Sequence, residues 1–170
     1  MYEEDYLLRL IKQIAATAAH LVGGHAIAQI VELNRSGDHR RALDEIDGAW
    51  DDLLDGPRGV ARAVDTPTLV GMLRDPVRLR LAAQLCAEEA RARAGLGDAA
   101  RAADRYRRAI ELVLEARAID PQSPDEQDLA ALRELTSAAP DAALAPRHRA
   151  LLQQALEGGG DGEARDDHRA

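Results

Sequence analysis

The sequence predicts an all-α protein built of antiparallel helical hairpins, and three observations support this fold class. Residues that favour helices, chiefly Ala, Leu, Arg and Glu, are abundant, whereas aromatic residues make up 2% of the chain and Phe is absent. Apolar residues recur every three or four positions. Gly, Pro and Asp interrupt this pattern at places typical of helix ends. We expect one domain over residues 1–157 and a disordered, polar tail over residues 158–170.

The first predicted helix, residues 6–22, is strongly amphipathic. Its single apolar stripe consists of Leu7, Leu10, Ile11, Ile14, Ala18, Leu21 and Val22. Gly23 and Gly24 predict a break or kink after it. Helical periodicity resumes over residues 25–35 and ends at the sequence SGD of residues 36–38.

Three further helices are predicted in the middle of the chain. The first covers residues 38–54. The second is short and opens with Thr66 as N-cap and Pro67 at the first helical position, where proline loses no hydrogen bond. Asp75 and Pro76 repeat this arrangement and open a longer helix that ends near residue 94.

Three more helices complete the predicted fold. One runs from Ala99 to about Ala118 and stops at the sequence DPQSP. Ser123, Pro124 and Glu126 form a capping-box pattern for a helix that ends near residue 138. Pro146 opens a last helix, which ends at residue 157.

Two stretches sixty residues apart share one pattern: GDHRRALDEIDGAWDDLL from Gly37 and GDAARAADRYRRAIELVL from Gly97. Aligned at their glycines, they place seven apolar residues at matching positions. We therefore expect each glycine to turn the chain between two antiparallel helices. We also expect the small residues of both stretches to be buried at helix crossings, namely Ala42, Ala49, Ala102 and Ala109.

This spacing of glycine, small, bulky and small residues resembles the second half of a tetratricopeptide repeat. The matching residues are Gly37, Ala42, Ile46 and Ala49 in the first copy, and Gly97, Ala102, Tyr106 and Ala109 in the second. The spacing of sixty residues, against about 34 in that family, marks the resemblance as divergent. The opening, an acidic residue before DYLLR and an amphipathic helix, is also similar to small uncharacterised bacterial proteins.

The resemblance implies a non-enzymatic helical module that scaffolds or binds another protein. Some tetratricopeptide domains hold a partner's C-terminal carboxylate with Lys, Arg and Asn of their first helices. The corresponding positions here are Ile27 and Val31, both apolar, and the second copy offers only Arg91. That binding mode is therefore not expected.

Charge and composition narrow the partners and the compartment. The net charge of −8 disfavours binding to a phosphate backbone, so we expect no nucleic-acid partner. No run of 18 apolar residues occurs, so we expect no membrane insertion. The acidic start MYEEDY is unlike a signal peptide, and the single Cys86 forms no internal disulfide. These features predict a reducing bacterial cytoplasm.

Residues able to bind metals or act as nucleophiles are scattered. His20 and His25 flank the glycine pair, but their spacing fits no metal motif, and the other histidines, His39, His148 and His168, lie far apart. We expect surface histidines, no metal and no cofactor. Cys86 lies on a helix rich in Ala and Leu, which predicts a buried structural thiol.

Four arginines on one helix could bind a phosphate or an acidic partner: Arg101, Arg105, Arg107 and Arg108. We interpret them instead as a solvated face balanced by Asp104, Glu111 and Glu115, with the pairs Asp104–Arg108 and Arg107–Glu111 at helical spacing. The alternative function is a small helical enzyme, either metal-dependent or acting on an anionic substrate, which would use His20, His25 and this arginine face.

The predicted partner-binding element is the N-terminal helix, because its stripe is the most hydrophobic in a chain otherwise built on Ala. Such a stripe must be covered, either by the core of this domain, by a second copy in a homodimer or by another protein. The candidate contact residues are Tyr2, Tyr6, Leu7, Arg9, Leu10, Ile11 and Ile14.

Overall fold

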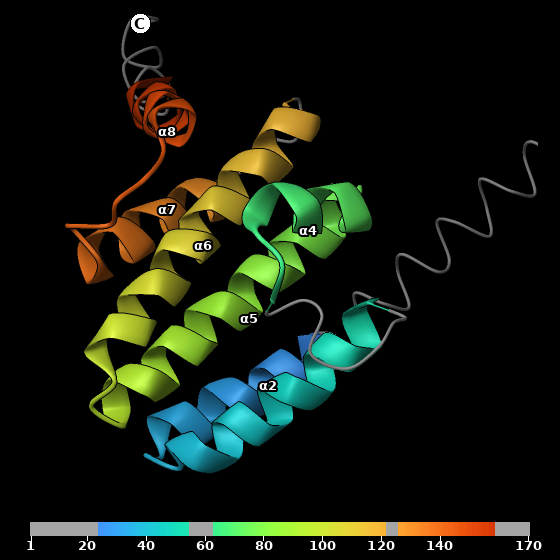
Figure 1. Cartoon of the computed structure of the whole chain (residues 1–170), viewed down its shortest axis with the longest axis vertical. Coiled ribbons are helices and arrows are strands. Elements are labelled where there is room, and N and C mark those ends of the chain that lie inside the picture. Colours follow the sequence, from blue (N-terminus) through green and yellow to red (C-terminus); the bar gives the residue numbers. More distant parts are fainter. Residues whose placement is uncertain (1–23, 55–62, 122–125, 159–170) are drawn as a thin grey trace, which may run out of the picture.

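The computed structural model describes residues 24–54, 63–121 and 126–158. Seven helices lie in these residues (Figure 1): residues 24–35, α2 (His39–Leu54), α4 (Thr66–Leu73), α5 (Pro76–Gly95), α6 (Ala99–Ile119), α7 (Glu126–Ala138) and α8 (Pro146–Gly158). The all-α prediction is confirmed. The predicted helix over residues 6–22, the cap at Ser123 and Pro124, and residues 159–170 of the tail lie outside the described residues.

Helix ends follow the sequence signals closely, with one correction. Asp75 caps α5 as predicted, because its carboxylate accepts a hydrogen bond from the Val77 amide at 2.9 Å and Pro76 follows directly. The cap of α4 is Asp65, whose carboxylate accepts from the Thr68 amide at 2.9 Å. Thr66 is therefore already the first helical residue, and Pro67 is the second.

The two glycine turns are equivalent in backbone geometry. Gly37 and Gly97 have φ values of 84° and 82°, a left-handed conformation that favours glycine. The amide after each glycine, at Asp38 and Asp98, donates to a carbonyl five residues earlier, at 2.9 Å in both turns. The glycine amides donate to carbonyls three residues earlier, at 3.2 and 3.0 Å. Both turns are therefore Schellman motifs, which end one helix and reverse the chain.

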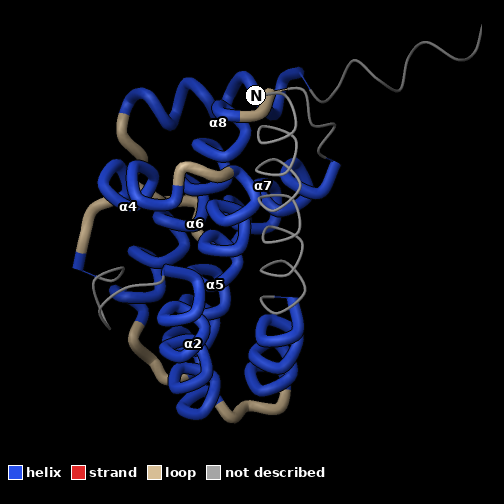
Figure 2. The backbone as a smooth tube through the Cα atoms, turned by 90° about the vertical axis from the view of Figure 1, so that its right-hand side faces the viewer, coloured by secondary structure: helices blue, strands red, loops and turns tan. Residues whose placement is uncertain are grey.

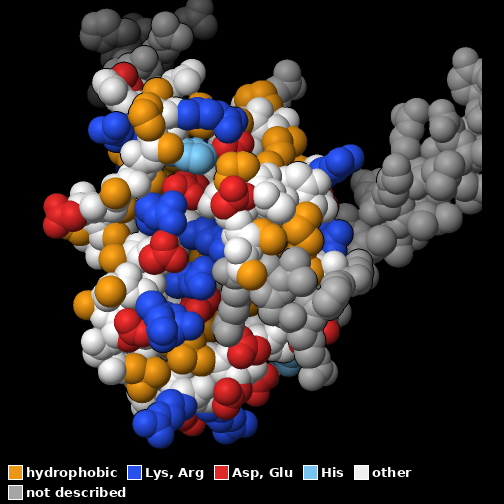
Figure 3. Space-filling model, in the orientation of Figure 1, with side chains coloured by type: hydrophobic (Ala, Val, Ile, Leu, Met, Phe, Trp, Pro, Cys, Tyr) orange, Lys and Arg blue, Asp and Glu red, His pale blue; other side chains and the backbone are white. Residues whose placement is uncertain are grey.

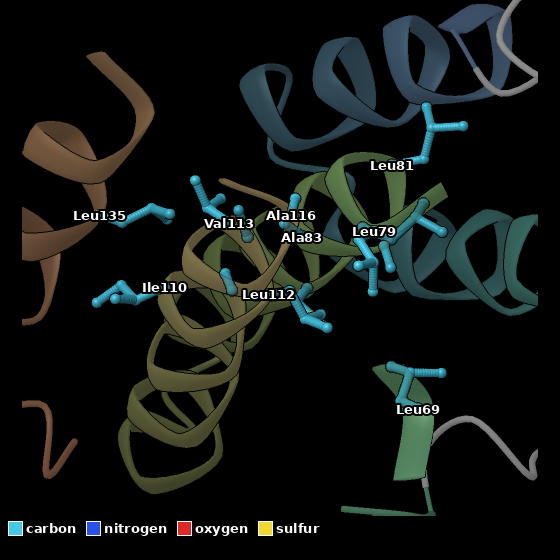
Figure 4. Close-up of a cluster of buried hydrophobic side chains, with 14 of the residues drawn as sticks. Leu69, Leu79, Leu81, Ala83, Ile110, Leu112, Val113, Ala116 and Leu135 are labelled. Atoms are coloured by element: carbon cyan, nitrogen blue, oxygen red, sulfur yellow. The ribbon is translucent and has the colours of Figure 1, made fainter. Parts of the chain in front are cut away.

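The antiparallel pair α5 and α6 forms the centre of the fold, and among α2 and α4 to α8 these two helices share the most extensive interface. Helix 24–35 and α2 form a second hairpin beside α5, while α4 packs on α5 and α6 from the other side (Figure 2). Helix α7 packs on α6, and α8 contacts both α6 and α7. In Figure 4, Leu81 points from α5 toward helix 24–35, whereas Ile110 points from α6 toward Leu135 of α7.

Three of the four small residues that were predicted to lie at helix crossings are buried. Ala42, Ala102 and Ala109 are buried, whereas Ala49 is half-buried. Ala103, which aligns with Leu43, is exposed. The structure thus contains antiparallel helix pairs joined by equivalent turns, and a tetratricopeptide repeat stays a prediction. Gly24 is helical, and whether the helix breaks at Gly23 lies outside the described residues.

None of the helices in the described ranges combines the length and the apolar character needed to cross a lipid bilayer. The expected cytoplasmic location stays a prediction.

Candidate functional site

A groove of about 590 Å³ lies between helix 24–35, α5 and α7. Figure 2 places helix 24–35 and α7 on the same side of α5, opposite α4. One wall is therefore the first helix of the N-terminal hairpin, the floor is α5 with Val113 of α6, and the second wall is α7. The groove is the candidate binding site of the described chain.

Apolar side chains make up most of the lining. They include Ile27 and Val31 of the first wall, Val77, Leu81 and Ala87 of the floor, and Ala131 and Leu135 of the second wall. Several of these, among them Ile27, Val31, Val77 and Ala131, are only half-buried. An apolar surface that is left partly exposed in a concavity is typical of a site that receives apolar groups of a ligand or partner.

Two ion pairs connect the floor to α7 and fix the second wall. The Arg80 guanidinium donates to both carboxylate oxygens of Asp128, at 3.0 and 3.1 Å. Arg91 is paired with Glu134 of α7 and with Glu88 of its own helix. Burial lowers the pKa of Arg91, but the carboxylates of Glu88 and Glu134 outweigh it and leave the pKa above its ordinary value. The guanidinium therefore stays charged and holds α7 at a fixed distance from α5.

Asn34 fixes the first wall in the same way. Its side-chain amide donates to the Glu88 carbonyl oxygen at 3.0 Å and to a Glu88 carboxylate oxygen at 2.8 Å. Glu88, which is buried, thus contacts both Asn34 at one side of the groove and Arg91 at the other. These hydrogen bonds pre-form the groove, because both walls are tied to the same floor helix.

The predicted partner-binding residues Tyr2, Tyr6, Leu7, Arg9, Leu10, Ile11 and Ile14 lie outside the described residues, as does His20. The groove itself was not predicted. In the sequence, Ile27 and Val31 indicated only that a carboxylate clamp is not expected. Their apolar character at a spacing of four residues was the signal for an apolar wall.

The interpretation of the arginine face as solvated is wrong for part of that face. Arg108, Glu111 and Glu115 are buried, and burial lowers the pKa of Arg108. The predicted pair of Arg107 with Glu111 is present at 2.8 Å, and Arg107 also contacts Asp104, at 2.6 Å. Figure 3 shows arginines interleaved with acidic side chains on this face.

Arg105 and Arg101 also have carboxylate partners, one on α5 and one at the start of α6. Arg105 lies 3.3 Å from Glu89 of α5, which also accepts from Arg93 at 2.8 Å. The exposed Arg101 lies 3.4 Å from Asp98. These carboxylates offset much of the positive charge of the arginine face, and the alternative of an anionic substrate at this face stays a prediction.

His148 is buried, which corrects the prediction that the histidines lie on the surface. Its Nε2 lies 2.9 Å from Glu115, and Arg147 contacts the same carboxylate at 2.7 and 2.9 Å. Glu111, four residues earlier on α6, accepts a short hydrogen bond of 2.5 Å from the Thr66 hydroxyl of α4. The two carboxylates therefore attach α4 and α8 to α6.

Cys86 is buried, as predicted. Burial raises the pKa of its thiol to about 12, so the reactive thiolate is suppressed. His25 is exposed and His39 is half-buried. In the ranges that the structure describes, no three His, Cys, Asp or Glu side chains are grouped so that they could hold a metal ion.

Comparison of the chain with protein-family models, with curated protein sequences and with solved structures finds no match in any of the three. The function proposed below therefore depends on the geometry of the groove and the hairpins alone.

Proposed function

We propose that this chain is a non-enzymatic interaction module that binds an apolar helix face in the groove between helix 24–35, α5 and α7. The observation that carries the proposal is the partly exposed apolar lining, which is enclosed by two walls tied to one floor helix. Helix-in-groove binding buries the apolar stripe of a partner helix against such a surface.

The order of the helices supports the same proposal. The first helix of each hairpin, 24–35 and α5, lines the groove, whereas α2 contributes no lining residue. Stacked helical hairpins build extended concave binding surfaces from corresponding helices in this manner. We propose on this basis that the tetratricopeptide-like arrangement of the sequence serves partner binding.

The polar residues of the groove suit orientation rather than catalysis. Arg80, Arg91 and Asp128 are engaged in ion pairs that hold the walls, and Gln84 and Gln127 are exposed at the rim, where amides can bond a partner backbone. The apolar floor would supply the affinity for a partner helix, and these polar groups would set the orientation in which that helix binds.

A photo-crosslinking amino acid placed at Gln84, an exposed residue of the groove lining, tests the proposal in the native host. We expect a crosslinked species that is absent when the same amino acid replaces Asp44, an exposed residue of α2. Mass spectrometry identifies the crosslinked chain, and either a second protein or a second copy supports a binding module.

A blocking variant provides the matched control. Ala131→Arg places a charged side chain in the groove and should abolish the crosslink at Gln84, whereas Ala118→Arg, on an exposed position of α6, should leave it unchanged. Circular dichroism verifies that both variants fold. A crosslink that survives Ala131→Arg, or equal crosslinking from Gln84 and Asp44, would exclude the groove as the binding site.

A further inference from the structure

We infer that the groove receives residues 6–22 of a second copy of this chain, so that two copies exchange their N-terminal segments. The inference rests on the proposed function and names the partner. It draws on the length of the groove, its charge and the point at which the described chain begins.

The length of the segment matches the groove. The lining residues of α5 extend from Val77 to Arg91, about 21 Å at the helical rise of about 1.5 Å per residue. Residues 6–22 in helical form measure about 25 Å by the same rise. The Leu and Ile residues of this segment recur at helical spacing and form the most hydrophobic stripe in the sequence, which in a helix would need an apolar surface to cover it.

The charges are also complementary. The groove lining contains three carboxylates, Glu88, Asp128 and Glu134, against two guanidinium groups. Residues 6–22 contain Arg9 and Lys12 and no acidic residue. Glu134 is largely exposed at the rim, where a basic side chain beside the apolar stripe can reach it.

The connection to the first wall favours a second copy over the same chain. Gly24 is already helical in the wall helix, and the stripe extends to Leu21 and Val22. Only Gly23 would then remain to reverse the chain, whereas two antiparallel helices need a connection of about two to five residues. A segment from a second copy needs no reversal. Because each copy supplies one segment and one groove, the exchange closes as a symmetric dimer.

Cysteine crosslinking between two separately labelled copies tests the exchange. One copy carries Leu10→Cys and the other Ala131→Cys, and the native Cys86 gives no background because its pKa is raised to about 12. After mixing and treatment with a short bis-maleimide, we expect a covalent heterodimer that neither variant forms alone. Crosslinking of Leu10→Cys alone would show that the segments pair with each other. A crosslinked monomer from the double variant would show that the segment binds its own groove, and either result overturns the exchange.

Light scattering supplies an independent measurement. We expect the full chain to have twice the monomer mass, and Ile11→Asp to halve it. Ala16→Asp should remain a dimer, because helical periodicity puts position 16 opposite the Leu and Ile stripe. If Ile11→Asp does not fold, Ala131→Arg tests the same contact from the groove side and should also give a monomer. A monomeric parent chain whose Gln84 crosslinks to another protein would overturn the exchange and leave the proposed function intact.

Discussion

The two helical hairpins share one turn geometry but differ in how much of their second helix is buried. In α2 a single stripe is buried, formed by Ala42, Ile46, Trp50 and Leu53. In α6 the corresponding stripe is buried together with an adjacent face that includes Arg108, Glu111, Leu112 and Glu115. At matching positions Gly48 and Asp52 are exposed in α2, whereas Arg108 and Leu112 are buried in α6.

The difference comes from the neighbours of each helix. Helix α6 packs on α5 and is also covered by α4, α7 and α8, whereas α2 packs beside α5 at the edge of the described fold. The same local pattern therefore forms a one-sided helix at the edge and a many-sided helix at the centre. Local sequence sets where the helix turns, and the position in the fold sets which of its faces are buried.

The largest expected effect is at the extra buried face of α6. Leu112→Ala should lower the free energy of unfolding by about 2 to 5 kcal/mol, because it leaves a cavity at a fully buried position. Asp52→Ala, at the matching exposed position of α2, should change it by less than about 0.5 kcal/mol. Urea unfolding measures both, and equal effects would contradict the contrast between the hairpins.

The next largest loss of stability is expected when the small residues shared by the two stretches are enlarged. Ala109→Leu should cost about 1 to 3 kcal/mol, because Ala109 is fully buried and extra methylene groups overpack the contact. Ala49→Leu, at the matching half-buried position, should cost less because part of the new side chain can face water. Thermal melts of the two variants measure the two losses of stability. A larger loss for Ala49→Leu than for Ala109→Leu would contradict the difference in burial.

The glycine turns should respond alike. Gly37→Ala and Gly97→Ala should each cost about 1 to 2 kcal/mol, since an L-residue is strained at these positive φ values. No atom lies within 4 Å of the position that either new Cβ would occupy, so backbone strain is the main cost. Chemical denaturation of the two variants should give losses within error of each other. Unequal losses would show that the turns, despite matching hydrogen bonds, are not energetically equivalent.

The last contrast between the hairpins concerns the reactivity of a thiol at Cys86 and at its matching position, Ala26. The native thiol should not react with a thiol reagent at pH 8, whereas Ala26→Cys should add one reactive thiol, because Ala26 is half-buried. In a denatured control both thiols should react. A reactive Cys86 in the folded chain would contradict its burial.

The raised pKa of Cys86 also predicts a dependence on pH. The unfolded thiol has the ordinary pKa of 9.0, and folding raises it to about 12. The protonated thiol is favoured in the folded state, so its contribution to stability is complete below pH 9 and is lost as the pH rises toward 12. Cys86→Ala should therefore lose less stability than the parent between pH 9 and pH 11, as measured by denaturant unfolding.

Most of the fold could be predicted from local signals. The Gly37 and Gly97 turns, the Asp75 cap and the start of α8 at Pro146 each depend on the backbone preferences of a few neighbouring residues. The sequence predicts the cap of α4 one residue too late, because Asp65 and Thr66 are both good capping residues. In the structure the Asp65 carboxylate caps the helix, and the Thr66 hydroxyl donates to Glu111 of α6 instead.

The groove and the buried charges could not be predicted in this way. The pairs Arg80–Asp128, Asn34–Glu88 and His148–Glu115 join residues 33 to 54 positions apart. A polar side chain on an amphipathic helix is expected to face water unless a distant helix covers it with a partner. Glu111, Glu115 and His148 are buried instead, because the packing of α4, α7 and α8 covers them.

The sequence by itself determined the helical class, most of the helix ends and the two matching turns, because propensity, capping and glycine conformation act over a few residues. Only the tertiary structure decided that α5 and α6 form the centre, that acidic and basic side chains of α6 are buried, and that helix 24–35 and α7 enclose an apolar groove. Burial and ion pairing depend on which distant helices meet, and that choice is made by packing of the whole chain rather than by any one stretch of it.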